Sequence, residues 1–159
     1  LLANIAIATE AAFAAGMVDR VAVLDWDVHH GNGTEAIFYD RDDVLTVSIH
    51  QERNYPLDTG DFEDRGSGVG EGYNLNIPLP AGAGHSTYLE AMERLVIPAL
   101  ADFQPDVIIV ASGYDAAPLD PLGGLAMALP LGLLGRYGGI AASLLARIGG
   151  LALTWWLWA

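Results

Sequence analysis

The fold of this chain is decided by residues 21–34, VAVLDWDVHHGNGT. The apolar run at the start of this stretch is typical of a strand that is buried on both faces. Four side chains that can bind ligands gather where the run ends: Asp25, Asp27, His29 and His30. In open α/β sheets, ligands bind at this place, outside the carboxyl ends of the strands. The stretch therefore predicts a parallel α/β sheet with a ligand site beside this strand.

Asp27 and His29 are separated by one residue. In an extended chain, side chains two positions apart point to the same side. A carboxylate oxygen and an imidazole nitrogen suit zinc and related divalent metals. The spacing by itself fits a polar strand end with capping residues equally well, because such short motifs often occur without a ligand.

The rest of the chain alternates between expected helices and strands. Helices are expected at residues 3–15, 34–39 and 86–103, and strands at residues 21–26, 44–49, 73–77 and 106–111. Gly16 is expected to end the first helix. A long polar loop follows at residues 50–72, and loops of this length are more often functional than idle. This alternation predicts a parallel sheet covered by helices on both faces.

Polar residues also follow the last expected strand, in SGYDAAPLDPLGG at residues 112–124. Asp115 thus comes just beyond the carboxyl end of a strand, as Asp27 and His29 do. A parallel sheet brings these ends to one edge, so we expect the three side chains to meet there. Two carboxylates and one imidazole leave a position for water or substrate, as a catalytic zinc requires. The second segment therefore favours a metal site.

The composition excludes several kinds of site. The chain has no cysteine, so disulfides, zinc–thiolate sites and a cysteine nucleophile are excluded. The formal net charge is −13 and every basic residue is arginine, which argues against nucleic acid as a partner. This charge fits an acidic surface and is compatible with a cationic substrate. The glycines of residues 66–72 lie in an acidic stretch without lysine, so they do not indicate a phosphate-binding loop.

The last part of the chain, residues 125–159, contains no acidic residue and ends in TWWLWA. Residues 137–159 are long enough to span a bilayer at about 20 residues per crossing. Arg147 would lie near the middle of such a span, and four glycines weaken a helix there. Buried core helices are therefore expected, with a membrane span as the alternative. The first residues lack the pattern of a secretory signal, and we expect the protein to be cytoplasmic.

Two segments resemble the histone deacetylase family. DWDVHHGNGTEAIFYDRDDVLTVSIHQ, residues 25–51, is similar to the zinc-binding strand and loop of that family. SGYDAAPLDPLGG is similar to the second metal segment of that family. Its residues are most similar to those of the class II branch and its bacterial deacetylase-like amidohydrolases, with the acetylpolyamine amidohydrolases as near relatives. The resemblance covers residues 4–124 and includes YNLNIPLP. It implies a partial deacetylase domain over residues 1–124 and an atypical tail over residues 125–159.

This resemblance implies the arginase–deacetylase fold, a three-layer α/β sandwich, and zinc-dependent hydrolysis of N-acetyl amides. It implies one zinc with the ligands Asp27, His29 and Asp115. It implies a structural potassium ion held by Asp25, the carbonyls of Asp27 and His29, the Ser48 hydroxyl and the Ile49 carbonyl. A second potassium ion would be held by carbonyls around Phe38, Arg41 and Val44, together with Tyr73. The resemblance places Tyr55 and Leu122 in the walls of an acyl-lysine tunnel, and Asn32 near a catalytic histidine.

Two parts of the family's machinery are not found among these residues. The adjacent His-His pair of the family, its general base and acid, lies upstream of the first expected helix. His29 and His30 are not that pair, because His29 is a ligand and His30 points the other way. The family's oxyanion tyrosine follows an apolar strand and a Gly-Gly pair, a setting that Tyr137 lacks. We therefore expect a fragment without catalytic residues, nearly inert by itself, whose tail beyond Met127 is unrelated or frame-shifted.

Two other functions stay open. The arginase branch of the fold binds two manganese ions and needs further acids beside each motif, whereas Asp115 is followed by no acid before Asp120. One metal therefore fits the sequence better. A non-catalytic metal-binding or membrane-associated module would match the missing base and the Trp-rich tail.

The expected partner is an acetylated amine, either acetyl-lysine or an acetylpolyamine. The two remaining histidines are expected to be structural. His50 follows the second expected strand, where it packs or hydrogen-bonds. His85 lies in the turn before a helix that Ser86 is expected to cap.

Overall fold

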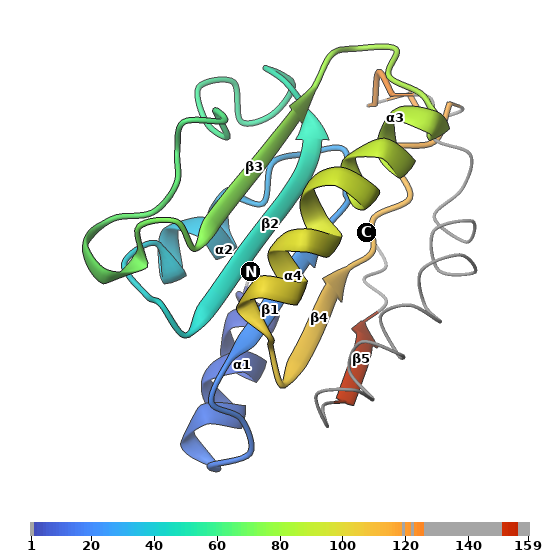
Figure 1. The fold of residues 1–159 in the computed structure, drawn as a ribbon. Helices are drawn as coiled ribbons and strands as arrows, with labels where there is room; N and C mark the ends of the chain where they lie inside the picture. The colour runs from blue at the N-terminus through green and yellow to red at the C-terminus, as the bar shows by residue number, and fades with distance from the viewer. Residues whose placement is uncertain (1, 119, 122, 126–150, 156–159) are drawn as a thin grey trace.

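The computed structural model describes residues 2–118, 120, 121, 123–125 and 151–155. In this part of the chain, one parallel sheet contains five strands: β1 (Val21–Asp25), β2 (Val44–Gln51), β3 (Asn74–Leu79), β4 (Val107–Ala111) and β5 (Leu151–Trp155). The strand order is β3-β2-β1-β4-β5 (Figure 1). The order reverses between β1 and β4, so the carboxyl ends of these two strands form the topological switch point of the sheet.

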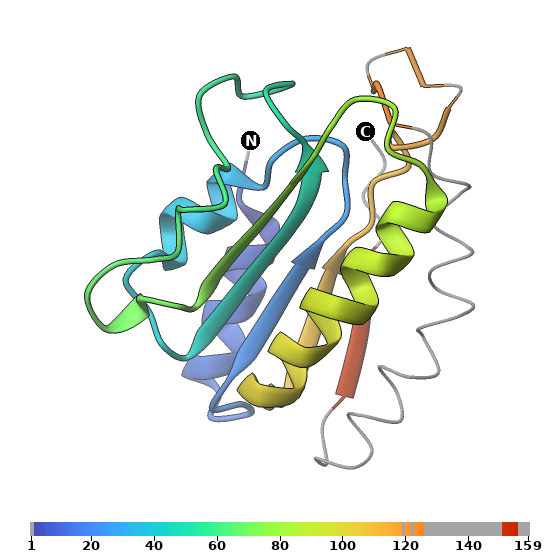
Figure 2. The same cartoon turned by 45° about the horizontal axis from the view of Figure 1, so that its top comes forward.

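Helices cover both faces of the sheet, which confirms the predicted architecture. One face carries α1 (Asn4–Ala14) and α2 (Asn32–Phe38) (Figures 1 and 2). The other face carries a longer helical segment made of α3 (His85–Ala91), the π-helical turn η2 (Met92–Val96) and α4 (Ile97–Phe103). A short 3₁₀ turn, η1 (Gly68–Gly70), lies in the long loop between β2 and β3.

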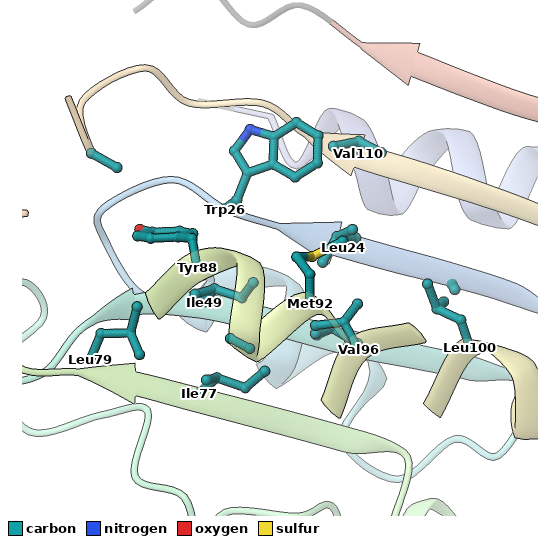
Figure 3. Packing of buried hydrophobic residues seen from close by; sticks show 14 of the residues in the cluster. Leu24, Trp26, Ile49, Ile77, Leu79, Tyr88, Met92, Val96, Leu100 and Val110 are labelled. Atoms are coloured by element: carbon teal, nitrogen blue, oxygen red, sulfur yellow. The ribbon is translucent and has the colours of Figure 1, made fainter. Parts of the chain in front are cut away.

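Alternate residues of β1 belong to two separate hydrophobic clusters. Leu24 belongs to the larger cluster, with Met92 and other side chains of α3, η2 and α4 (Figure 3). Val23 belongs to the second cluster, with Phe38 of α2 and side chains of α1. Because both faces of β1 are buried, the strand is an unbroken apolar run rather than an alternating one.

The helix expected at residues 86–103 differs from the prediction in two ways. It contains the π-helical turn η2, because Pro98 has no N–H to donate to a carbonyl of the preceding turn. It also begins one residue earlier, at His85. The expectation that Ser86 caps this helix is wrong: Gly84 is the N-cap, with extended backbone and no side-chain cap, and Ser86 already lies in the first turn.

Two other boundaries are informative. The prediction that β2 ends at residue 49 is wrong, because His50 and Gln51 still pair with β3, opposite Pro78 and Leu79. The prediction that Gly16 ends the first helix is confirmed. Gly16 has a φ of +63°, its N–H bonds to Phe13, and the next N–H reaches Ala12 in the pattern of a Schellman motif.

In the tail, the structure describes only residues 151–155. They form β5, which pairs with β4 from Val107↔Leu151 to Ala111↔Trp155, so the expectation of a helix is wrong for these residues. The expected positions of Leu122 and Tyr137 lie outside the described residues. Within the described part of the chain, the helices lack the length and apolar character needed to cross a bilayer.

One side chain links the beginnings of β1 and β4. Asp106 Oδ2 accepts hydrogen bonds from the backbone N–H groups of Asp19 (2.7 Å) and Arg20 (2.9 Å). We expect Asp106→Ala to lower the free energy of unfolding by about 1–2 kcal/mol, because both bonds are lost from a partly solvated site. Urea denaturation measures this change. Asp102→Ala, at an exposed position of α4, is the control and is expected to change stability by less than about 0.5 kcal/mol. Equal effects of the two substitutions would contradict the prediction.

Candidate metal centre

Three side chains that can bind a metal meet at the switch point of the sheet. Asp27 and His29 follow β1, and Asp115 follows β4. Nδ1 of His29 lies 2.9 Å from Oδ1 of Asp27 and 3.0 Å from Oδ2 of Asp115. The possible ligand atoms of the three residues lie within 4.8 Å of one another, and they form the one such group among the described residues. The predicted meeting of the three side chains is confirmed.

The backbone that carries Asp27 and His29 is not extended, which corrects the expectation from their spacing. The strand β1 ends at Asp25, and residues 27–29 form a bend. The backbone N–H of His29 donates to Oδ1 of Asp27 (2.7 Å), so this carboxylate closes the bend. Local hydrogen bonding, rather than strand alternation, therefore brings the two side chains together.

Three contacts hold the segment after β1 against the segment after β4. The N–H of Val28 donates to Oδ1 of Asp115 at 2.9 Å. The indole Nε1 of the buried Trp26 donates to the Ser112 hydroxyl at 3.2 Å. Gly113 packs so closely against Asp27 that a Cβ atom at Gly113 would lie 2.4 Å from Oδ2 of Asp27. The segments after β1 and β4 are therefore in direct contact and leave no room for an added side chain at Gly113.

Two carboxyl groups at this site, those of Asp25 and Asp27, have raised pKa values, so their ionised forms are poorly stabilised by the protein. Burial and, to a smaller extent, the negative charge of Asp27 together raise the pKa of Asp25 to about 8, against the lowering effect of a hydrogen bond from the Asp27 N–H. Burial also raises the pKa of Asp27, and Asp115 contributes in the same direction. A bound cation would stabilise the ionised forms of these acids.

The donor set fits a zinc ion. Two carboxylate oxygens converge on one imidazole nitrogen, where only a single proton can be shared between them. A divalent cation can accept electron pairs from all three atoms at once. Oxygen and nitrogen donors in this number match catalytic zinc sites, which keep a position for water or substrate.

The residues expected to bind potassium lie in two places. Asp25 and Ser48 face each other across β1 and β2, with Ile49 next in the strand. The Ser48 hydroxyl accepts a hydrogen bond from the Gly31 N–H at 3.2 Å. The second group is made of positions at the end of α2, in the turn after it, at the start of β2 and before β3: Phe38, Arg41, Val44 and Tyr73. Potassium binding stays a prediction in both places.

The resemblance places Tyr55 and Leu122 in the walls of an acyl-lysine tunnel, and Asn32 near a catalytic histidine. Tyr55 is 67% exposed, and its ring meets the ring of His29 edge-on, with 6.1 Å between centroids. Asn32 is the first residue of α2 and lines the same pocket as the three metal-binding candidates. Leu122 lies outside the described residues. The roles of these residues in substrate binding stay predictions.

The two buried histidines have structural partners. His30 donates from Nε2 to Glu35 and shares a hydrogen bond at Nδ1 with the Thr59 hydroxyl. His50 lies within β2 rather than after it, donates from Nε2 to the carbonyl of Gly60, and contacts the Ser48 hydroxyl through Nδ1. Burial lowers the pKa of His50 to about 4, with a further contribution from His30, so His50 is neutral at pH 7.

Sequence reasoning missed the buried acceptor Glu35 and the two asparagines that bind it, Asn74 and Asn76. The asparagines carried a usable signal. They are two positions apart in a strand, so their side chains share a face, and two amides on one face of a buried strand require a polar partner. No comparable pattern surrounds Glu35, because its two asparagine partners come from a distant part of the chain.

Comparisons with known proteins agree with this geometry. Residues 1–131 match the histone deacetylase domain. A histone deacetylase-like amidohydrolase of Pseudomonas aeruginosa is 58% identical over 120 residues, which cover 76% of this chain and 32% of the relative. Histone deacetylase 14 of Arabidopsis thaliana, a chloroplastic protein, is 43% identical over 77% of this chain and 29% of its own length. This chain therefore spans about a third of the length of these curated relatives.

A comparison with solved structures supports the same family. The crystal structure of an acetylpolyamine aminohydrolase from Burkholderia pseudomallei superposes with a TM-score of 0.82 at 37% identity, and the match covers 96% of this chain and 43% of that one. The parallel sheet described above is therefore that of the arginase–deacetylase fold. The division of the chain at residue 124 stays a prediction. Sequence, fold and the placement of the metal-binding candidates lead to one conclusion: the chain belongs to the histone deacetylase family.

Proposed function

We propose that this chain carries the metal site of a zinc-dependent hydrolase that removes acetyl groups from N-acetylated amines. The observation that carries the proposal is the convergence of Asp27, His29 and Asp115 at the switch point of the sheet. The names of similar proteins, which include histone deacetylases and an acetylpolyamine aminohydrolase, support acetyl-lysine or an acetylpolyamine as the substrate class.

The residues of this chain would hold the metal and shape the approach to it. Asp27 and Asp115 supply negative charge, and the hydrogen bond from Val28 to Asp115 orients the second carboxylate. When bound, zinc would supply a Lewis acid for the amide carbonyl and for a water molecule. Tyr55 is largely exposed and lies beside His29, where its ring can contact the acyl chain of a substrate.

The metal content of the purified chain tests the first half of this proposal. We expect about one zinc per chain by elemental analysis, since the donor set is that of a single catalytic zinc site. Asp27→Ala is expected to abolish binding, because it removes one of the three ligands. Circular dichroism of the variant checks that it is still folded. A folded chain that binds no zinc would refute the proposal for this site.

Acetate release tests the second half. An acetyl-lysine peptide and an N-acetylpolyamine are incubated with a protein that contains this chain together with the remainder of the family domain. We expect hydrolysis that stops when a chelator removes the metal and returns when zinc is added. Two manganese ions per chain would favour the arginase-like alternative, and stable zinc binding without hydrolysis of either substrate would favour a non-catalytic metal-binding module.

A further inference from the structure

A second buried polar group lies next to the metal-binding segment. Oε2 of Glu35 accepts three hydrogen bonds: from Asn74 Nδ2 (2.7 Å), from Asn76 Nδ2 (2.7 Å) and from His30 Nε2 (3.2 Å). The side chains of His30 and Glu35 are 2% and 15% exposed, so little water reaches these bonds. We call these four residues the Glu35 network. It joins α2 to the strand β3 and to the residue after His29.

The Glu35 network also holds the first part of the loop between β2 and β3, residues 52–67, which we call the entrance loop. Asn74 Nδ2 donates to the carbonyl of Asp64 at 2.7 Å, and Asn76 Nδ2 donates to the carbonyl of Asp61 at 3.4 Å. His30 reaches the loop twice, through its ring to the Thr59 hydroxyl (2.9 Å) and through its backbone N–H to the carbonyl of Tyr55 (3.2 Å). Each partner of Glu35 is therefore also a partner of this loop.

The entrance loop brings Tyr55 to the metal site. Its ring meets that of His29 edge-on, but it is 67% exposed and has little packing of its own to hold it there. The position of the ring must then come from the backbone of the loop. We infer that Glu35 is a positioning residue, which fixes the entrance loop, and with it Tyr55, over the metal centre through His30, Asn74 and Asn76. The inference rests on the proposed function only where it treats Tyr55 as part of a substrate site.

A carboxylate suits this position because one oxygen must accept from three N–H donors. Burial acts to raise the pKa of Glu35, but the hydrogen bonds from His30, Asn76 and Asn74 outweigh it, and the pKa lies below its usual value. Glu35 is therefore ionised at neutral pH. Hydrogen bonds to a charged acceptor are stronger than those between neutral groups, which makes one side chain sufficient to order a whole loop.

Two variants of Glu35 separate the effect of its hydrogen bonds from the effect of its side-chain volume. In Glu35→Leu, the side chain keeps its approximate size but accepts no hydrogen bond. In Glu35→Gln, the amide oxygen can still accept the same bonds. We expect Glu35→Leu to speed amide hydrogen exchange in the entrance loop by about tenfold or more, the factor that corresponds to the loss of a single net hydrogen bond. We expect Glu35→Gln to restore part of the protection, because its neutral amide oxygen accepts the same bonds more weakly than a carboxylate does. Glu90→Gln, in an exposed pair with Arg94, is the matched control and should leave exchange unchanged.

A second readout follows Tyr55 itself. Because the two rings are in contact, we expect the ring current of Tyr55 to shift the NMR signals of the His29 ring protons, and Tyr55→Leu gives the positions of these signals without that ring current. We expect Glu35→Leu to move the His29 signals toward the positions seen in Tyr55→Leu, whereas Glu35→Gln should leave them near those of the unmodified chain. A merely structural role for Glu35 would lower stability without moving the His29 signals in this specific direction.

Both measurements are made on the metal-free chain, so they do not depend on zinc binding. Unchanged loop exchange and unchanged His29 signals in a folded Glu35→Leu variant would overturn the inference but not the proposed function. If amide exchange rises throughout β1 and β2, Glu35→Leu has unfolded. The variant Thr59→Val then tests the inference in its place. Thr59→Val removes the hydroxyl that is bonded to His30 at 2.9 Å and that also donates to the carbonyl of Pro56 in the loop at a longer 3.4 Å. Faster exchange confined to the loop then supports the inference, and no change overturns it.

Discussion

Asp115→Asn is expected to lower the affinity of the chain for zinc by about a hundredfold to a thousandfold. This range follows from the roughly 10–16 kcal/mol with which four ligands hold a structural zinc ion, shared among the ligands. The remaining amide oxygen can still accept the hydrogen bond from the Val28 N–H that Oδ1 accepts now. The amide nitrogen would then face Nδ1 of His29, where Oδ2 lies at 3.0 Å, and an amide NH₂ is no zinc ligand.

The measurement is a competition titration of zinc against a chelating dye. Asp120→Asn is the matched control, because Asp120 lines the same pocket and the substitution removes the same charge, but Asp120 lies outside the group of three ligands. We expect the control to retain its affinity within about threefold, the effect of a partly screened charge at the rim of a site. Equal losses for the two variants would mean that the general negative charge of the pocket, rather than Asp115, binds the metal.

Gly113→Ala is expected to damage the metal site without removing any ligand. The added Cβ would lie 2.4 Å from Oδ2 and 2.8 Å from Cα of Asp27, so Asp27 and the segment of Gly113 must shift relative to each other, which disturbs the arrangement of the three ligands. We expect zinc affinity to fall by about tenfold to a hundredfold, as happens when the groups that orient metal ligands are changed. The free energy of unfolding should fall by about 1–3 kcal/mol because of overpacking.

Gly33→Ala is the control for this substitution. A Cβ at Gly33 meets no atom within 4 Å, and the residue lies in the helix α2, where alanine is the better helix former. Zinc affinity should be unchanged and stability equal or slightly higher. The dye titration and urea denaturation measure both quantities. If Gly113→Ala binds zinc as tightly as Gly33→Ala does, the segments after β1 and β4 are not held in the tight contact described here.

Much of the site followed from local patterns. The apolar run before Asp25 identified a buried strand, and polar residues placed directly after two such strands had to meet at one edge of a parallel sheet. The positions of Asp27, His29 and Asp115 were predictable for this reason. The bend that carries Asp27 and His29 was not, because it is closed by the side chain of Asp27 itself.

The parts that could not be predicted depend on long-range pairing. The strand β2 continues through His50 and Gln51 because β3 lies beside it and accepts the extra pairing. Residues 151–155 have the composition of a buried helix, yet β4 offers a free edge, and they join it as β5. In both cases a neighbouring strand, and not local propensity, decides the secondary structure.

By itself, the sequence determined the class of fold, the two motifs and the donor atoms that they bring to the switch point. These follow from periodicity and residue type, which act over a few neighbouring positions. Only the tertiary structure decided how Glu35, Asn74 and Asn76 meet, and how they tie the entrance loop to the metal segment. The bonds from Asn74 and Asn76 to Glu35 join residues 39 and 41 positions apart, and polar groups inside the fold take whichever partner the packing of the sheet brings within reach.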